Sequence, residues 1–292
     1  MRVAVLEETM ASKMRERLKG VACEIRFAEP LAPYTTFQIG GPADAIAFPK
    51  SETEMVELIE RARMNGLPVT VLGGGANLLV GDGGVRGLVV TLSYGFRQLD
   101  LSEGEPSEGE ALLEAGAGVK TPALVRYAAH RGLIGLECLA GVPGTVGGAL
   151  AMNAGTAERY LQDAVESIRW IRISKGAVES LASEALGFDY RQTEFPEPGI
   201  VVAVRFQLRM EEPAALLSSL RKDVAVRRER QPSGFPCAGS IFRNPSGDQA
   251  GRLIETAGMK GRRVGGAEVS HAHANFFVNR GGATAADVMS LV

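Results

Sequence analysis

The stretch GVPGTVGGALAMNAG, residues 141–155, contains five glycines, one proline and no charged side chain. Loops are usually polar and strands usually avoid so much glycine, so neither element accounts for this composition. Glycine tolerates positive φ and lets backbone N–H groups come close to a ligand. The stretch therefore indicates a surface that wraps a large ligand and meets its anionic part with main-chain donors. The alternative is a region of tight turns between strands.

A second glycine-rich stretch, VLGGGANLLVGD at residues 71–82, follows a predicted strand. A dinucleotide fingerprint requires G-x-G-x-x-G before a helix, but Leu78 stands at the third glycine position. A Walker A loop is excluded because no Gly-Lys-Ser/Thr sequence follows. Consecutive N–H groups from Gly73 to Asn77 would still hold a pyrophosphate, and a hairpin corner is the alternative. Two such stretches in one chain favour the ligand interpretation.

The bulk composition is that of a globular chain with room for two or three domains. The chain has 292 residues, of which 45% are hydrophobic and 23% charged, with a net charge of −2. The chain has no excess of basic residues, so its charge gives no reason to expect nucleic acid or an anionic membrane as a partner. We expect no signal peptide and no membrane span. The isolated cysteines Cys23, Cys138 and Cys237 predict a reducing cytoplasm rather than disulfides or zinc.

Helical periodicity and end signals predict several helices. Ser51 and Glu54 form a capping box for a helix that ends at Gly66. Thr121 is the predicted cap of the next helix, and Thr284 with Asp287 begins the last one. Further helices are expected over 213–232 and 249–257, and strands over 42–49, 68–72, 84–92, 165–173, 199–210 and 267–279. Because the chain stops about two turns into its last helix, we expect the sequence to be cut inside an element.

Two polar residues are candidates for chemistry. The guanidinium of Arg191, in the segment GFDYR, suits a substrate carboxylate, although spacing alone favours an ion pair with Glu194 or Asp189. Ser240, in AGSIFRNP, has no adjacent histidine and no nucleophile elbow, so it is a poor nucleophile. It would donate a proton if a cation stabilised its alkoxide, whereas most serines in such turns are merely hydrogen-bonded.

Two charged or titratable clusters remain open. Arg227, Arg228 and Arg230 would face a diphosphate or form a solvated helix end, and the two interpretations are equally supported. His271 and His273 would share one face of the strand expected over 267–279. No pattern of further ligands accompanies them, so we expect no metal, and one of the pair is a ligand contact or a core histidine.

Taken together, six motifs resemble the UDP-N-acetylenolpyruvoylglucosamine reductase (MurB) family. They are, in order, YTTFQIGGPAD, VLGGGANLLV, GVPGTVGGALAMNAG, DYR, AGSIFRNP and GGAEVSHAHANFFVN. The resemblance runs from Pro33 to Val292. The compact stretch between Arg191 and Glu211 is closer to the shorter, second type of the family.

The resemblance implies an α+β fold. It implies a two-subdomain FAD-binding unit of the vanillyl-alcohol-oxidase (PCMH) type, followed by a smaller α+β substrate domain. We expect an N-terminal extension over 1–32, the FAD-binding domain over 33–211 with subdomains at about 33–92 and 93–211, and the substrate domain over 212–292. The substrate domain is expected to be incomplete, because the family's catalytic glutamate lies on a strand beyond the last helix.

The implied activity is NADPH-dependent, FAD-mediated reduction of UDP-N-acetylglucosamine enolpyruvate to UDP-N-acetylmuramate. This reaction belongs to peptidoglycan precursor synthesis in the cytoplasm, and we expect a monomer. A catalytically silent flavin-binding homologue is the alternative, since the glutamate lies outside the sequence. A related FAD oxidase with another substrate is a third interpretation, against which DYR and AGSIFRNP speak.

The resemblance also assigns roles to residues. Arg191 would stabilise charge developing on the enolpyruvyl carboxylate, and Ser240 would give a proton to C2. Ala76 stands where the family usually has serine, which would cost at most about 1 kcal/mol of FAD binding. The implied UDP-sugar contacts are Tyr190, Arg230, Asn244 and His273. The implied FAD contacts are Ile39, Gly40, Gly41, Leu72, Gly73, Gly74, Gly75, Ala76, Asn77, Leu78, Gly141, Pro143, Gly144, Thr145, Gly147, Gly148, Asn153 and Gly155.

Overall fold

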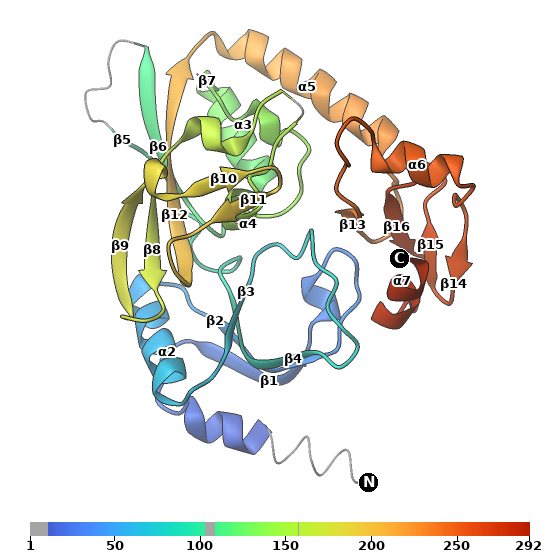
Figure 1. Ribbon diagram of the computed structural model, residues 1–292. Helices are drawn as coiled ribbons and strands as arrows, with labels where there is room; N and C mark the ends of the chain where they lie inside the picture. The colour runs from blue at the N-terminus through green and yellow to red at the C-terminus, as the bar shows by residue number, and fades with distance from the viewer. Residues whose placement is uncertain (1–10, 103–108, 157) are drawn as a thin grey trace. The chain divides into compact units, whose positions relative to one another are not determined.

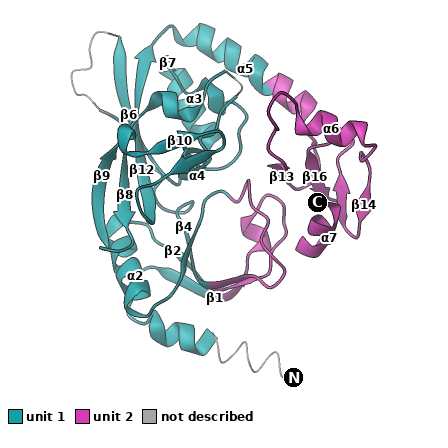
Figure 2. Ribbon diagram, viewed as in Figure 1, with its two compact units in different colours: residues 1–27, 45–74, 87–224 teal, residues 28–44, 75–86, 225–292 magenta. Residues whose placement is uncertain are grey.

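The computed structural model describes residues 11–102, 109–156 and 158–292. It divides into two compact units (Figure 2). Unit 1 comprises residues 1–27, 45–74 and 87–224, and unit 2 comprises residues 28–44, 75–86 and 225–292. Unit 2 thus joins C-terminal residues to two segments of the predicted FAD-binding domain, and the functional boundary at 211/212 stays a prediction. The first ten residues of the predicted extension 1–32 lie outside the described residues, and residues 11–17 are helical.

A six-stranded antiparallel sheet organises unit 1 (Figure 1). Trp170 and Phe206 on its strands are fully buried, and Leu124 and Leu150 belong to the same apolar core. The apolar residues of these strands therefore share one core with two helices. The strands are β5 (Leu99–Ser102), β6 (Glu110–Gly116), β12 (Gly199–Met210), β8 (Val165–Arg172) and β9 (Ala177–Ala182) in that order, with β7 (Leu133–Ile134) on β12, and the helices are α3 (Thr121–His130) and α4 (Val146–Ala151).

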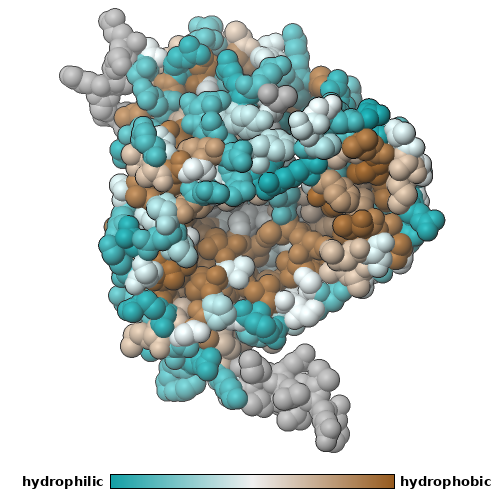
Figure 3. Space-filling view, viewed as in Figure 1, coloured by the Kyte–Doolittle hydropathy of each residue, from teal (hydrophilic) through white to brown (hydrophobic). Residues whose placement is uncertain are grey.

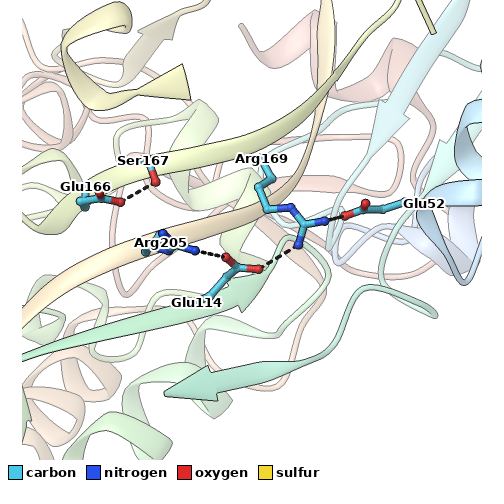
Figure 4. Close-up of polar contacts among 6 residues, drawn as sticks. All are labelled: Glu52, Glu114, Glu166, Ser167, Arg169 and Arg205. Atoms are coloured by element: carbon cyan, nitrogen blue, oxygen red, sulfur yellow. Dashed lines mark hydrogen bonds and ion pairs between the residues drawn. The ribbon is translucent and has the colours of Figure 1, made fainter. Parts of the chain in front are cut away.

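Charged side chains from neighbouring strands of this sheet form a network (Figure 4). Glu114 on β6 accepts hydrogen bonds from Arg169 at 3.1 Å and Arg205 at 3.2 Å. Arg169 also pairs with Glu52 of helix α2 (Glu52–Met64). Burial lowers the pKa of Arg169, but the two glutamates outweigh it and raise the pKa above its ordinary value. Cross-strand ion pairs thus specify the register of the partly exposed side of the sheet.

A second sheet has the strand order β1-β2-β4-β3. Helix α2 belongs to the same apolar core, and its residues at helical spacing, Met55, Leu58, Ile59 and Ala62, are fully buried. Ser51 accepts a hydrogen bond from the N–H of Glu54, so the predicted cap is confirmed. The strands are β1 (Glu24–Pro30), β2 (Pro42–Phe48), β4 (Val85–Thr91) and β3 (Val69–Leu72).

Unit 2 contains a four-stranded antiparallel sheet with helices α6 and α7. Phe37 and Ile39, far upstream in sequence, join Phe277 and Val288 in its core. Apolar residues including Phe242, Leu253 and Leu291 line a hollow of about 300 Å³, and Figure 3 shows hydrophobic side chains gathered over this C-terminal part. The sheet order is β13 (Cys237–Ser240), β16 (Phe276–Asn279), β15 (Ala267–Val269) and β14 (Arg263–Val264), and the helices are α6 (Ala250–Thr256) and α7 (Ala285–Leu291).

The remaining described elements are short, apart from one long helix. Helix α5 spans Pro213–Arg230, as predicted to within two residues. None of the helices in the described part of the chain is both long and apolar enough to cross a membrane. The others are the 3-10 turns η1 (Ala32–Tyr34), η2 (Glu137–Leu139), η3 (Leu161–Ala164) and η4 (Ser183–Ala185), and the hairpin strands β10 (Gly187–Asp189) and β11 (Gln192–Glu194).

Two local expectations were wrong. Lys120, not Thr121, is the N-cap of α3, because the Thr121 hydroxyl donates to the carbonyl of Val142 instead. The strand expected over 267–279 is interrupted between Val269 and Phe276. The N–H of Phe276 closes a turn on the carbonyl of His273, so that β15 and β16 pair antiparallel. A continuous period-two pattern in the sequence conceals this turn.

Candidate functional site

The two glycine-rich stretches meet within unit 1. A Cβ placed on Gly74 would lie 2.7 Å from the Cα of Gly144, and one on Gly73 would lie 2.8 Å from the Oγ1 of Thr145. The two stretches therefore contact each other through backbone atoms and the Thr145 hydroxyl. A side chain at Gly73 or Gly74 would push the stretches apart. We call Gly73, Gly74, Gly144 and Thr145 the glycine cradle. The sequence predicted both stretches but not this direct contact.

The hydroxyl of Thr145 is a buried polar group that makes no hydrogen bond to the described protein. Its side chain is 2% exposed, and its Oγ1 has no hydrogen-bond partner among the described residues. Buried hydroxyls are normally bonded, so this one, which lies beside the glycines of the cradle, is available to a ligand bound there. Among the described residues, the backbone N–H of Gly74 likewise donates to no main-chain carbonyl. A dinucleotide pyrophosphate needs such donors, so the cradle fits FAD.

The stretch 141–155 is not a region of turns only. Val146–Ala151 form α4, which begins directly after Thr145. The N–H groups of Val146 and Gly147 donate to the carbonyls of Val119 and Ala117, fastening the helix start to the segment that follows β6. This backbone fastening, rather than a side-chain cap, positions the Thr145 hydroxyl.

The stretch 71–82 is not a hairpin corner, because β3 and β4 pair parallel. Beyond Gly74 the chain enters unit 2. At Gly75 φ is +62°, and a Cβ there would lie 2.1 Å from the carbonyl oxygen of Tyr34. The N–H of Thr36 donates to the Gly75 carbonyl at 3.0 Å, and its hydroxyl donates to the Cys237 carbonyl at 2.7 Å. Thr36 thus ties the glycine-rich loop to the strand that carries Ser240.

The far end of this loop is held by Asp82. Its two carboxylate oxygens accept the N–H groups of Ala285 at 2.8 Å and Ala286 at 3.0 Å, at the start of α7. Thr284 and Asp287 form the predicted capping box of the same helix. Nothing in the sequence around Asp82 indicates a partner 203 positions away. Sequence reasoning therefore missed Asp82 and Thr36.

The predicted contacts Ile39, Gly40 and Gly41 support this loop. The side chain of Ile39 is 2% exposed and belongs to the core of unit 2. A Cβ at Gly40 would lie 2.9 Å from that of Val80, and one at Gly41 would lie 2.0 Å from the carbonyl oxygen of Asp82. Ile39 therefore offers a ligand only its backbone. Among the other predicted contacts, Leu72 is buried and Leu78 is exposed.

Arg191 lies in the turn of a small hairpin in unit 1. Its backbone φ is +58°, a region that non-glycine residues rarely adopt. Its guanidinium donates to the carbonyl of Gly155 at 3.0 Å and lies 5.5 Å from the centre of the Tyr190 ring. Asp189 accepts the N–H of Tyr190, and Glu194 accepts from Gln192. An unusual backbone conformation held at an arginine is typical of a functional position.

The other predicted residues belong to unit 2. Ser240 is exposed at the end of β13. Asn244 accepts the N–H of Ala250 at the start of α6, and Arg230 is exposed at the end of α5. The structure therefore places Ser240, Asn244, Arg230 and His273 in one unit and Tyr190 and Arg191 in the other.

His273 is half-buried in the loop between β15 and β16. Its Nδ1 accepts the N–H of Asn275 at 3.2 Å. Burial, together with the positive charge of Lys260, lowers its pKa below the ordinary histidine value. The ring is therefore neutral near pH 7 and offers Nε2 as a polar contact. In the described part of the chain, no group of three or more His, Cys, Asp or Glu is arranged to hold a metal ion.

Comparisons with known proteins agree with this arrangement. Residues 43–182 match the family described as FAD binding domain, and residues 231–292 match the UDP-N-acetylenolpyruvoylglucosamine reductase C-terminal domain. The chain is 45% identical to the UDP-N-acetylenolpyruvoylglucosamine reductase of Moorella thermoacetica, over 94% of this chain and 87% of that protein. The reductase of Myxococcus xanthus is 44% identical, over 92% and 86%. The crystal structure of the MurB enzyme from Thermus caldophilus is 39% identical, covers 92% of each chain and superposes with a TM-score of 0.77.

Proposed function

The chain belongs to the UDP-N-acetylenolpyruvoylglucosamine reductase family, and from that premise we propose that it reduces UDP-N-acetylglucosamine enolpyruvate to UDP-N-acetylmuramate with NADPH. The α+β fold and the FAD-binding domain followed by the family's C-terminal domain agree with the sequence-based prediction. The reaction belongs to peptidoglycan precursor synthesis. We also infer that the protein acts in the cytoplasm as a monomer.

One structural observation carries the proposal. The buried Oγ1 of Thr145 has no partner among the described residues, and it lies in a cradle whose glycines admit no side chain. A buried polar group without a partner is costly, and a ligand that accepts its hydrogen bond would remove that cost. This observation supports a bound dinucleotide, and relatives that are 45% and 44% identical support the substrate.

The chemistry that FAD supplies when bound is hydride transfer from NADPH to C3 of the enolpyruvyl double bond. The protein must stabilise the negative charge that then develops next to the substrate carboxylate. We assign this role to Arg191, because a guanidinium carries the positive charge that such an intermediate needs. An arginine donates in a fixed planar fork, which suits a carboxylate.

We assign to Ser240 the proton that C2 must receive. Its position at the exposed end of β13 leaves the hydroxyl accessible to a substrate. Tyr190, Arg230, Asn244 and His273 are proposed to bind the UDP-sugar. The neutral His273 ring and the exposed Arg230 suit a sugar hydroxyl and a diphosphate, respectively.

The proposal is tested with the purified chain and FAD. Binding is followed by flavin absorbance and fluorescence, and turnover by NADPH oxidation in the presence and absence of the enolpyruvyl substrate. We expect bound flavin, substrate-dependent NADPH oxidation and a product two mass units heavier than the substrate. A protein that stays colourless after incubation with FAD contradicts the proposal.

Ser240→Ala separates the two half-reactions. This variant should still bind FAD and still oxidise NADPH once, because neither step uses the serine. Product formation should fall by roughly a hundredfold or more, since the proton donor is gone. A variant that keeps full product formation would remove Ser240 from the mechanism.

A further inference from the structure

The hairpin that carries Arg191 cannot hold its position alone. Strands β10 and β11 form a separate two-stranded sheet with only three residue pairs, Gly187–Glu194, Phe188–Thr193 and Asp189–Gln192. Two-stranded hairpins of this size are marginally stable in water. The positive φ of Arg191 adds backbone strain to this small sheet. The surrounding structure must therefore supply anchors.

Three hydrogen bonds fasten the hairpin to the C-terminal half of the stretch 141–155. The Nδ2 of Asn153 donates to the carbonyl of Asp189 at 3.1 Å. The hydroxyl of Thr193 donates to the carbonyl of Leu150 in a buried contact. The third bond comes from Arg191 itself, to the carbonyl of Gly155. The anchors thus lie before, after and at the turn.

Asn153 is fully occupied by these contacts. Its side chain is 1% exposed, and its Nδ2 donates to the Oε1 of Gln162 at 2.6 Å as well as to Asp189. Its Oδ1 accepts the backbone N–H of Gln162 at 3.2 Å, which settles the orientation of the amide because an N–H must meet an oxygen. An asparagine amide has two donor hydrogens, and both are used. None remains for an anionic cofactor.

On the basis of the proposed function, we propose that Asn153 is a positioning residue that fixes the Arg191 hairpin, and that it does not bind FAD directly. Its own φ of +37° suits asparagine better than most residues, which accounts for this residue type at the turn after α4. The geometry revises the cofactor role that the family resemblance implied for Asn153. It links the end of the cofactor-binding stretch to the charge-stabilising arginine.

The test compares Asn153→Gly with Asn153→Asp. Glycine accepts the positive φ and removes the amide, so it breaks the anchor without straining the backbone. Aspartate keeps the shape but loses both donors and places a carboxylate against the carbonyl of Asp189. We expect the dissociation constant of FAD to change by less than about twofold in both variants, while kcat falls by roughly ten- to a hundredfold because the arginine is misplaced.

A second comparison separates positioning from general destabilisation. In the Arg191→Gln background, Asn153→Gly should lower kcat no further, since it acts through Arg191. Hydrogen exchange at the Tyr190–Gln192 amides should accelerate in Asn153→Gly while exchange in β12 stays unchanged. Gln162→Ala removes only one of the partners of Asn153 and should give a smaller loss.

The outcomes are distinguishable from failure of the proposed function. An inactive but flavin-bound wild-type protein refutes the reductase assignment, and the hydrogen-exchange and FAD-affinity measurements still test Asn153. Weaker FAD binding in Asn153→Gly, at unchanged hairpin exchange, overturns the positioning role and restores the direct cofactor contact.

Discussion

The glycine-rich stretch 141–155 and the loop 75–84, which overlaps the second glycine-rich stretch 71–82, look alike in sequence but are stabilised differently. The first is held by contacts of short and intermediate sequence separation, with Asn153 bonded to Gln162 nine positions away and to Asp189 36 positions away. The second is held from Thr36, 39 positions upstream of Gly75, and from α7, 203 positions downstream of Asp82. One stretch contains a helix, and the other has no regular structure between β3 and β4.

The difference shows that glycine serves two purposes in this protein. In the loop 75–84, Gly75 and Gly84 have positive φ, and a side chain would collide with backbone. In α4, a Cβ at Gly148 would meet only the Oγ1 of Thr145 at 3.5 Å, an ordinary contact. Gly75 and Gly84 are therefore required by the fold, whereas the fold does not require Gly148. We attribute Gly148 to the ligand.

The largest expected effect comes from Gly84→Ala. The new Cβ would lie 1.8 Å from the carbonyl oxygen of Pro42, and φ is +75°. We expect the free energy of unfolding to fall by about 3 kcal/mol or more, measured by denaturant titration. Gly83→Ala is the matched control, because its Cβ has open space and should change stability by less than about 0.5 kcal/mol. Equal effects at the two positions would show that the collision at Gly84 does not determine the stability of the loop.

Asp82→Ala should have the next largest effect. It leaves the N–H groups of Ala285 and Ala286 without their carboxylate acceptor. We expect a loss of about 2 kcal/mol in the free energy of unfolding and faster hydrogen exchange at those two amides. Asp82→Asn keeps one acceptor oxygen and should lose about half as much. Unchanged exchange at Ala285 would show that the loop does not depend on its distant anchor.

Gly148→Ala should act in the opposite direction on stability. Alanine is a better helix former than glycine, so we expect a gain of about 0.5–1 kcal/mol. The same methyl group should weaken FAD binding if the glycine serves the ligand, measured by titration of flavin fluorescence. A variant that gains stability and keeps wild-type affinity would assign Gly148 to neither purpose.

The smallest expected effect is that of low pH on the free energy of unfolding, through His273 in unit 2. The stretch 141–155 has no titratable side chain, whereas unit 2 contains His273, whose pKa is lowered by burial and by Lys260. Below about pH 6.5 His273 becomes protonated in the unfolded chain, whereas in the folded protein its ring stays neutral until the pH falls to its lowered pKa. The free energy of unfolding should therefore fall as the pH drops through this window and level off below the folded pKa. His273→Gln should remove this part of the pH dependence, and exposed His271 provides the control substitution His271→Gln.

Local structure was predictable where short-range chemistry decides it. The capping residues Ser51 and Thr284, the buried face of α2 and the main strands of the large sheet all follow from patterns within a few residues. The loop that contains His273 was missed because apolar residues on both sides continue a strand pattern across it. Thr121 was misassigned because its hydroxyl found the carbonyl of Val142, 21 positions away.

The sequence by itself determined the family, the two glycine-rich stretches and the residue types offered for chemistry, because motifs and periodicity are local properties of a chain. Only the tertiary structure decided that Gly74 lies against Gly144 and that Asp82 accepts hydrogen bonds from the start of α7. It also decided that the Asn153 amide donates to the hairpin that carries Arg191. These contacts depend on where distant backbone donors and carbonyls come to lie. A hydrogen bond of about 3 Å is specified by that placement and leaves no trace in the spacing of residues.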